Sequence, residues 1–223
     1  MPLILIILVA LVVICTRLYI ACKAQPIRRP RTTNTCSLAV FLGSGGHTTE
    51  SLTLLGSLDF SRYTPRTYIV SQGDLLSVQK AIALEASKME ESISQPKPPY
   101  TIVTIPRARR VHQPLIATPP TALYSLLIAI WRLTFAPRLL NANLPEVLVL
   151  NGPGTCFSLC VAAYLNRFLG IPSPRMVYIE SFARVKSLSL SGKLLRSVVD
   201  SFVVQWPDLL SDGKRGVYRG WMV

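Results

Sequence analysis

The sequence predicts an α/β protein: a Rossmann-like domain with a parallel sheet, preceded by one N-terminal transmembrane helix. The first observation behind this fold class is an apolar run at residues 37–42, which leads through a glycine-rich loop into a helix start. The second is that similar apolar runs alternate with helical segments to the C-terminus, a pattern typical of a parallel sheet covered on both faces. The third is an apolar N-terminal stretch of about twenty residues, enough to span a bilayer. The chain therefore divides into a transmembrane anchor (1–22), a basic linker (23–35) and the Rossmann-like domain (36–223).

The N-terminal segment is apolar from Leu3 to Cys15 and continues past Arg17 to Cys22. A basic cluster follows it directly and consists of Lys23, Arg28, Arg29 and Arg31. Because basic residues next to a span remain in the cytosol, the domain should face the cytosol. A signal peptide would begin with basic residues, whereas this start carries none. We expect an uncleaved single-pass anchor, with a cleaved signal peptide as the alternative.

The chain is strongly basic, with 24 Lys and Arg residues against 11 Asp and Glu residues and a net charge of +13. This balance suits anionic lipid headgroups, phosphorylated substrates or nucleic acid. The sequence lacks the aromatic–basic interleaving of common RNA-binding modules and the spacing of zinc fingers, so nucleic acid is not expected as a partner. None of the 5 cysteines belongs to a Cys-x-x-Cys pair, and with only 2 histidines no metal site is expected either.

The other elements follow the first strand and helix in order. Strands are expected at residues 67–70, 100–105, 146–150, 176–179 and 201–205, with helices ending near residues 91 and 169. A second apolar segment, residues 115–135, contains Pro119, Pro120 and Arg132, which argue against a second span. The sequence leaves two alternatives open for it: a core helix, or a helix in the membrane interface with Trp131 at the level of the headgroups.

Nearly every predicted strand ends in a loop of glycines, hydroxyls, amides or charged residues. In a parallel sheet these loops share one edge, which is where ligands bind. We therefore expect the following residues to lie together: Gly45, Gly46, His47, Asp74, Arg107, Arg109, His112, Gly152, Gly154 and Glu180.

The glycine-rich loop at residues 43–48 reads GSGGHT and lies between a strand and a helix. This arrangement points backbone N–H groups and the helix dipole at an anion, most often a phosphate or diphosphate. A nicotinamide cofactor is not favoured, because Thr48 stands where the dinucleotide fingerprint has its third glycine. The absence of a Gly-Lys-Ser/Thr triplet excludes a P-loop. His47 lies inside the loop, within reach of whatever the loop holds.

Five motifs together carry a resemblance to a known family: GSGGHT (43–48), PRAR (106–109), NGPG (151–154), YIES (178–181) and FVVQWP (202–207). They resemble the membrane-anchoring subunits of the two-chain UDP-N-acetylglucosamine transferases of dolichol-linked oligosaccharide synthesis. The likeness runs from Cys36 to the C-terminus and extends to the N-terminal anchor. More distantly, the chain is similar to the acceptor-binding half of the bacterial N-acetylglucosaminyltransferase that forms lipid II.

The resemblance implies that the domain is the N-terminal half of a GT-B glycosyltransferase and is inactive alone. A separate cytosolic catalytic subunit would bind the donor UDP-GlcNAc, and this chain would recruit it to the endoplasmic reticulum membrane, with the nuclear envelope as a second location. The complex would add the second GlcNAc to dolichyl-diphospho-GlcNAc in N-glycan precursor synthesis. No metal and no cofactor are expected, since there is no Asp-x-Asp motif. The alternative is a purely structural membrane scaffold without substrate contacts.

The candidate site residues fall into three groups. His47 and Glu180 are the candidate catalytic residues, and whether His47 is a base or a phosphate contact stays open. The acceptor diphosphate should contact Ser44, Gly45, Gly46, Thr48, Arg107 and Arg109. The partner subunit should dock on the aromatic and aliphatic C-terminal tail, through Tyr218, Trp221, Met222 and Val223, with packing of the tail on its own domain as the alternative.

Overall fold

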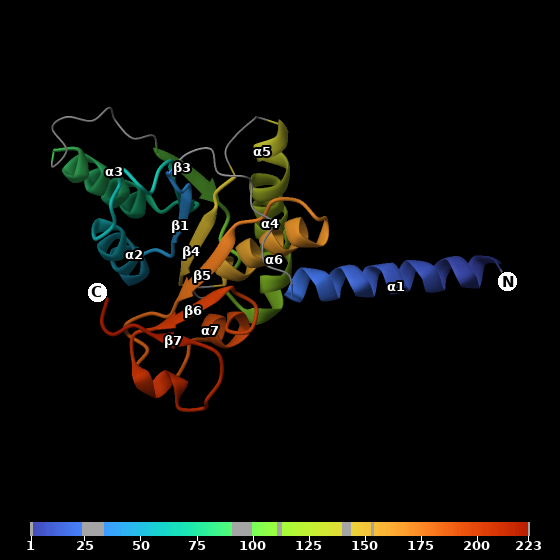
Figure 1. The fold of residues 1–223 in the computed structure, drawn as a ribbon. Helices are drawn as coiled ribbons and strands as arrows, with labels where there is room; N and C mark the ends of the chain where they lie inside the picture. The colour runs from blue at the N-terminus through green and yellow to red at the C-terminus, as the bar shows by residue number, and fades with distance from the viewer. Residues whose placement is uncertain are drawn as a thin grey trace.

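The computed structural model describes residues 2–23, 34–90, 100–110, 113–139, 144–152 and 154–222. Its centre is a seven-stranded, entirely parallel sheet in the order β3-β2-β1-β4-β5-β6-β7 (Figure 1). The strands are β1 (Leu38–Leu42), β2 (Arg66–Ser71), β3 (Tyr100–Ile105), β4 (Val147–Asn151), β5 (Arg175–Ile179), β6 (Ser201–Val204) and β7 (Val217–Tyr218). The chain builds outward from β1 to β3 and then returns to place β4 on the other side of β1. The switch point of this topology, where ligands bind in such sheets, therefore lies between β1 and β4.

Helices cover both faces of the sheet, as predicted (Figure 1). One face carries α2 (Gly46–Gly56) and α3 (Leu75–Glu90), and the other carries α4 (Thr118–Ile130), the π-helix η2 (Trp131–Phe135), α5 (Ala136–Leu139) and α6 (Thr155–Phe168). The short helices are η1 (Leu115–Ala117), α7 (Leu190–Leu195) and η3 (Pro207–Leu210). The predicted α/β class with a parallel sheet is confirmed, and so are the predicted strands, whose ends differ from the observed ones by at most one residue.

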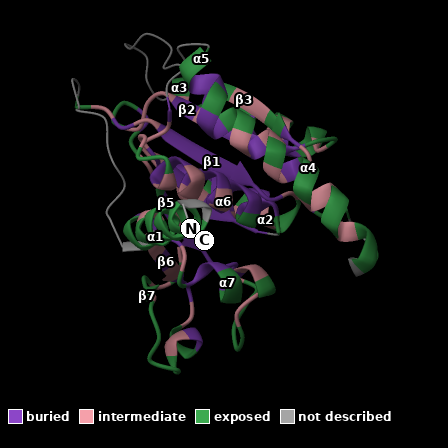
Figure 2. Cartoon of the chain, turned by 90° about the vertical axis from the view of Figure 1, so that its right-hand side faces the viewer, coloured by how far each residue is buried: buried purple, intermediate pink, exposed green. Residues whose placement is uncertain are grey.

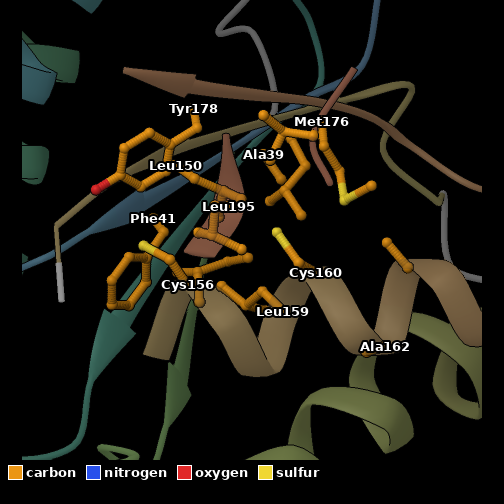
Figure 3. Close-up of a cluster of buried hydrophobic side chains, with 14 of the residues drawn as sticks. Ala39, Phe41, Leu150, Cys156, Leu159, Cys160, Ala162, Met176, Tyr178 and Leu195 are labelled. Carbon is orange, nitrogen blue, oxygen red and sulfur yellow. The ribbon is translucent and has the colours of Figure 1, made fainter. Parts of the chain in front are cut away.

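The two helical layers give the protein two apolar cores, one on each side of the sheet. Successive side chains of a strand point to opposite faces. In β1, Ala39 and Phe41 face α6, whereas Leu38, Val40 and Leu42 face α2 and α3. All five are buried, which explains why the strand reads as an unbroken apolar run rather than an alternating one. Figure 3 shows the α6 side of this packing, where Phe41 and Leu150 lie against Cys156 and Leu159.

The helix α1 (Pro2–Lys23) projects away from the domain, and its N-terminal end lies far from the sheet (Figure 1). Its residues Ile4–Ala21 have a mean hydropathy of 2.8, and only 6% of them are buried inside the protein. The predicted N-terminal span is thus a continuous, exposed, apolar helix. At its other end Arg17 donates hydrogen bonds to the carbonyl of Phe168, one of them from Nε at 2.9 Å, which fastens α1 to the C-terminal end of α6. The prediction for the linker falls mostly on residues 24–33, which lie outside the described part of the chain.

The second apolar segment forms α4 and the π-helix that continues it, and it has two different faces. Ser125, Ala129 and Leu133 are buried against the rest of the domain. A stripe of large apolar side chains on the other face is exposed, and it consists of Leu123, Tyr124, Leu127, Trp131, Phe135 and Leu139. Residues three and four apart lie on one side of a helix, so these side chains form one continuous band. The segment therefore packs on the core with one face and leaves its apolar other face uncovered.

The structure adds one strand that the sequence analysis did not predict. β7 pairs in parallel with β6 through Val203–Val217 and Val204–Tyr218, and it places part of the C-terminal tail at the edge of the sheet. Two residues are too short a run for a pattern of apolar residues to show.

Candidate functional site

The glycine-rich loop leaves β1 at the switch point and is open to solvent. Ser44 and Gly45 have positive φ angles of 66° and 57°, which turn the chain directly into α2. No side chain caps the N-terminus of α2, so its first N–H groups have no side-chain partner. A Cβ atom built on Gly45 or Gly46 meets nothing within 4 Å. The loop therefore has backbone donors and a helix dipole that an anion could use, and its predicted anion-binding role remains a prediction.

His47 lies in the first turn of α2 and is held against the end of β4. The space for its ring comes from Gly152, because a Cβ atom there would lie 3.3 Å from His47 Cγ and 3.2 Å from the Cα of Gly43. Gly152 also has a φ of 123°, a value that other residues rarely adopt. The ring nitrogen Nδ1 of His47 lies 2.7 Å from Oδ1 of Asn151, the last residue of β4.

Asn151 is fully buried and connects His47 to a carboxylate that the sequence analysis did not select. Its amide nitrogen donates to Oε2 of Glu50 at 2.8 Å. The other oxygen of Glu50, Oε1, accepts hydrogen bonds from Ser181 Oγ at 2.8 Å and from the backbone N–H of Phe182 at 3.2 Å. One chain of hydrogen bonds thus joins the exits of β1, β4 and β5. In the sequence Glu50 stands three residues after His47, on the same side of a helix, but this position alone does not reveal its contact with Asn151.

Glu180 ends up in a different environment from His47. It is buried, and its Oε1 accepts from the N–H of Ser181, while Oε2 accepts from both the N–H and the hydroxyl of Ser189 at 3.0 Å. Ser189 in turn caps α7 by accepting from the N–H of Gly192. These contacts hold the loop between β5 and α7. They favour a structural role for Glu180, and its predicted catalytic role remains a prediction.

The hydroxyl of Tyr178 and the thiol of Cys156 are buried beneath the site, and burial keeps both groups protonated. Burial, with a smaller contribution from the charge of Glu180, raises the pKa of Tyr178 well above its usual range. The neutral hydroxyl lies 3.4 Å from the carbonyl oxygen of Gly152 and 3.3 Å from Ser189 Oγ, so it supports the glycine on which His47 packs. Burial also raises the pKa of the Cys156 thiol well above its ordinary value. Cys156 is therefore a core residue and not a nucleophile.

The arginine loop after β3 folds back over the helices of the α6 face. The N–H of Ala108 donates to Thr155 Oγ1 at 3.2 Å, which ties this loop to the start of α6. Arg107 and Arg110 line a surface cavity of about 490 Å³ together with Gln72, Gly73, Pro106, Thr121 and Tyr124. By contrast, Arg109 donates from Nε and Nη2 to the carbonyl of Gln113. Of the two predicted arginines, Arg107 lines the cavity, whereas Arg109 is hydrogen-bonded within its own loop. Arg110, which was not predicted as a site residue, also lines the cavity.

The remaining predicted residues of the strand exits are placed as follows. The hydroxyl of Thr48 points inward and lies 2.6 Å from that of Ser77 in α3, and the side chain is buried, so its hydroxyl is not directed to the open loop. Asp74 accepts from the N–H and the hydroxyl of Ser77 and caps α3. Gly154 is exposed at the start of α6. His112 lies outside the described residues.

The C-terminal tail contacts its own domain and still leaves a large aromatic side chain exposed. The N–H of Met222 donates to Oε1 of Gln205 at 3.1 Å. Trp221 contacts Trp206 at a tilt and Phe182 edge to face, with ring centroids 5.4 and 6.2 Å apart, but is 68% exposed. Tyr218 in β7 is also exposed, and Val223 lies outside the described residues. The predicted docking role of the tail stays a prediction.

No group of three or more His, Cys, Asp or Glu side chains that could hold a metal ion occurs within the described ranges. The site places a histidine at a helix start that can bind an anion, and two arginines line a cavity at the exits of β2 and β3. These residues can accept a proton and bind a phosphate.

Comparison with known proteins gives one matching family model, described as "Oligosaccharide biosynthesis protein Alg14 like", over residues 38–222. The UDP-N-acetylglucosamine transferase subunit ALG14 of Cryptococcus neoformans var. neoformans serotype D is 49% identical over 190 residues, which are 84% of this chain and 81% of that protein. The subunit of the same name from Schizosaccharomyces pombe is 48% identical over 82% of this chain and 81% of its own length. The human subunit is 42% identical over 84% of this chain and 83% of its own length.

Among solved structures, the crystal structure of MurG from Acinetobacter baumannii has a similar fold, with a TM-score of 0.50 and 13% sequence identity. The similarity covers 83% of this chain but only 45% of MurG. The predicted relation to one half of a two-domain GT-B fold is confirmed at the level of the fold.

Proposed function

The chain belongs to the family of Alg14-like oligosaccharide biosynthesis proteins, and we propose that it is the membrane-anchoring, acceptor-side subunit of a UDP-N-acetylglucosamine transferase. In this proposal the reaction is the addition of the second GlcNAc to dolichyl-diphospho-GlcNAc at the cytosolic face of the endoplasmic reticulum membrane. The donor UDP-GlcNAc is bound mainly by a separate cytosolic catalytic subunit. The names of the relatives support a transferase subunit, and the specific step and compartment rest on the resemblance of the motifs.

The observation that carries the proposal is the open glycine loop with His47 fixed beside it at the switch point of the sheet. Free N–H groups at the start of α2 can hold the diphosphate of the acceptor. His47 is the second residue of α2 and so lies among those donors. A histidine so placed can accept the proton of the attacking hydroxyl, or donate a hydrogen bond to a phosphate oxygen.

A second line of support is the way in which the domain meets a membrane. If α1 crosses the bilayer, then its bond to the end of α6 through Arg17 holds the domain against the membrane surface. Figures 1 and 2 show that α4 and α5 run crosswise to α1, and so along that surface. The exposed apolar stripe of α4 suits the interface, where Trp131 can sit at headgroup level. Of the two alternatives for this segment, we propose a helix that packs on the core and also lies in the interface.

The arginine cavity lies between the exposed side of α4 and the exits of β2 and β3. Tyr124 belongs to the exposed side of α4 and also lines the cavity, together with Arg107 and Arg110. A lipid diphosphate whose tail remains in the bilayer would reach the strand exits by this route, and its charge would be met by the two guanidinium groups. A scaffold without substrate contacts has no need of this cavity or of a positioned histidine.

A partner chain is part of the proposal because the relatives are named as subunits of a transferase. In the proposal this second chain supplies the other lobe with the donor site. The exposed Trp221 and Tyr218 at the end of the sheet are the proposed docking residues for that chain.

The experiment that tests the proposal is a transferase assay with purified full-length chain in lipid vesicles. UDP-GlcNAc and a polyprenyl-diphospho-GlcNAc acceptor are supplied, with and without the donor-binding subunit. Product should form only when both chains are present, and the His47→Ala variant should bind the partner normally but transfer little sugar. If the His47→Ala, Arg107→Ala and Arg110→Ala variants all turn over at the normal rate, the scaffold alternative is correct.

A further inference from the structure

Glu50 is the half-buried inner end of the hydrogen-bond chain that reaches His47, and its position determines how the rest of that chain is arranged. Its Oε1 is occupied by two donors, the hydroxyl of Ser181 and the N–H of Phe182. Its Oε2 faces the side-chain amide of Asn151 at 2.8 Å. An ionised carboxylate can only accept hydrogen bonds, so the group of Asn151 that faces it must be the NH₂.

The orientation of Asn151 then determines which ring nitrogen of His47 carries the hydrogen. With its NH₂ directed to Glu50, Asn151 presents its carbonyl oxygen Oδ1 to His47 at 2.7 Å. A carbonyl oxygen is only an acceptor, so Nδ1 of His47 must carry the hydrogen. In the neutral ring the other nitrogen, Nε2, then has a free lone pair. Nε2 has no hydrogen-bond partner among the residues that the structure describes, and the side chain is half-buried beside the open loop.

We infer that Glu50 is a positioning residue that acts through Asn151 to hold His47 as the Nδ1–H tautomer, with Nε2 as the acceptor that faces the substrate. The inference rests on the proposed function and makes it more specific: of the two roles left open for the neutral ring, acceptance of the hydroxyl proton is the one compatible with this tautomer. A neutral Nε2 without a hydrogen cannot donate to a phosphate oxygen. The diphosphate is then held by the loop and the arginines.

The same geometry explains why Glu50 and not Glu180 is coupled to the histidine. The oxygens of Glu180 are taken up by Ser181 and Ser189, and none of its described hydrogen bonds goes to Asn151 or His47. Both carboxylates bind the loop after β5, but only Glu50 also contacts the end of β4.

The direct test is the position of the ring hydrogen, read from the ¹⁵N chemical shifts of the imidazole. The full-length chain is labelled with ¹⁵N-histidine in detergent micelles at about pH 8, where a histidine is mostly neutral. His112 is replaced by Asn so that only His47 reports. We expect a hydrogen on Nδ1 in this background, and a mixture of tautomers or mainly Nε2–H in the Glu50→Gln and Asn151→Leu variants. A hydrogen on Nε2 in the parent chain would overturn the inference.

Ser181→Ala is the matched control, because it removes one donor to Oε1 of Glu50 and leaves the bond from Asn151 to Oε2 in place. If Glu50 only held the β5 loop, Ser181→Ala and Glu50→Gln would have similar effects. Under the inference, Ser181→Ala keeps the Nδ1–H tautomer. A normal tautomer in Glu50→Gln would also contradict the role of Glu50.

Kinetics of the two-chain complex supply an independent readout. Glu50→Gln should lower kcat by about 10- to 100-fold with little change in KM for the lipid, as is usual for a supporting partner of a functional histidine. Asn151→Leu, which leaves Nδ1 without an acceptor, should cost more, up to the roughly 10⁴-fold loss known for a wrong histidine tautomer. An unchanged kcat in both variants would overturn the inference. If the parent pair shows no transferase activity, the proposed function fails, and the ¹⁵N shifts still decide the arrangement of the ring.

Discussion

Two polar clusters lie on the α2/α3 side of this domain, and one is closed whereas the other is open. In the closed cluster Arg66 binds both oxygens of Glu85, at 2.7 and 2.8 Å, and Tyr68 donates to the same carboxylate at 2.6 Å. The guanidinium group also donates to the carbonyls of Phe60 and Tyr63 and lies over the Phe60 ring. In the open cluster, Glu50 and Asn151 are satisfied internally, but the chain of bonds ends at His47, whose Nε2 has no described protein partner.

The difference teaches which polar groups serve the fold and which serve a ligand. A buried charge must be compensated, and each of the three guanidinium nitrogens of Arg66 has an acceptor inside the domain. Burial and the carboxylate of Glu85 raise the pKa of Tyr68 well above its usual range, so this hydroxyl stays a donor. The open cluster instead ends in a ring nitrogen of His47 that has no described partner, at the glycine loop. Satisfied polar groups stabilise, and an ordered but unsatisfied one at a strand exit indicates a site.

The largest expected effect comes from breaking the open cluster at its end. His47→Ala should lower the transferase rate of the two-chain complex by roughly 10²–10⁴, the range for a lost general base. The unfolding midpoint should change little, since the ring is only half-buried and contacts a glycine and an amide. Rate and thermal unfolding are measured on the same preparation. A normal rate would mean that the open end of the cluster has no chemical role.

Breaking the closed cluster should have the opposite result. Glu85→Ala leaves the charge of Arg66 buried without its partner and should lower the free energy of unfolding by about 3–5 kcal/mol. The kcat per folded complex should be unchanged, because the cluster is not connected to His47. Tyr68→Phe is the milder control, since it removes one of the hydrogen bonds to Glu85 and leaves the ion pair. Urea unfolding of the full chain in detergent measures both losses, and equal losses in the two variants would contradict the central role of the ion pair.

The aromatic cluster at the end of the sheet lies between these two cases, because Trp206 is anchored and Trp221 is not. Trp206 donates from Nε1 to the carbonyl of Phe182 at 2.8 Å, whereas Trp221 only touches the other two rings and is 68% exposed. Trp221→Ala should weaken binding of the donor-binding subunit by more than about 2 kcal/mol, roughly 30-fold in Kd. Stability and membrane association should remain normal. Unchanged retention of the partner in a pull-down would assign the tail to its own domain.

The sequence was sufficient for the parts of the fold that depend on local patterns. β1 to β6 are apolar runs bounded by glycines or polar residues, so their positions could be predicted closely. β7 could not, because two residues form a strand only when β6 offers them a free edge. The glycine loop and His47 were recognisable as local motifs. Glu50 was not, because its partners Asn151 and Ser181 are 101 and 131 residues away along the chain, and only the folded sheet brings them together.

The arginine loop shows the same limit of sequence-based prediction on a smaller scale. From the sequence alone Arg107 and Arg109 were equivalent candidates for the acceptor diphosphate. In the structure Arg107 lines the cavity, while two nitrogens of Arg109 donate to the carbonyl of Gln113. An arginine already engaged with its own loop must give up those bonds before it can bind a phosphate, which reduces what it can contribute.

Arg107→Ala should therefore raise the apparent KM for the lipid acceptor about tenfold, the loss expected for one charge-assisted hydrogen bond of roughly 1.5 kcal/mol, and leave the KM for UDP-GlcNAc alone. Arg109→Ala should raise it less, and Arg110→Ala should resemble Arg107→Ala, because Arg110 shares the cavity. Both KM values are measured in vesicles at fixed lipid composition, so that the general attraction of a basic chain to the membrane is constant. If Arg109→Ala has the largest effect of the three, the arginine that binds Gln113 is released when the acceptor binds. The surface that binds the acceptor would then include Arg109 as well as the two arginines that line the cavity.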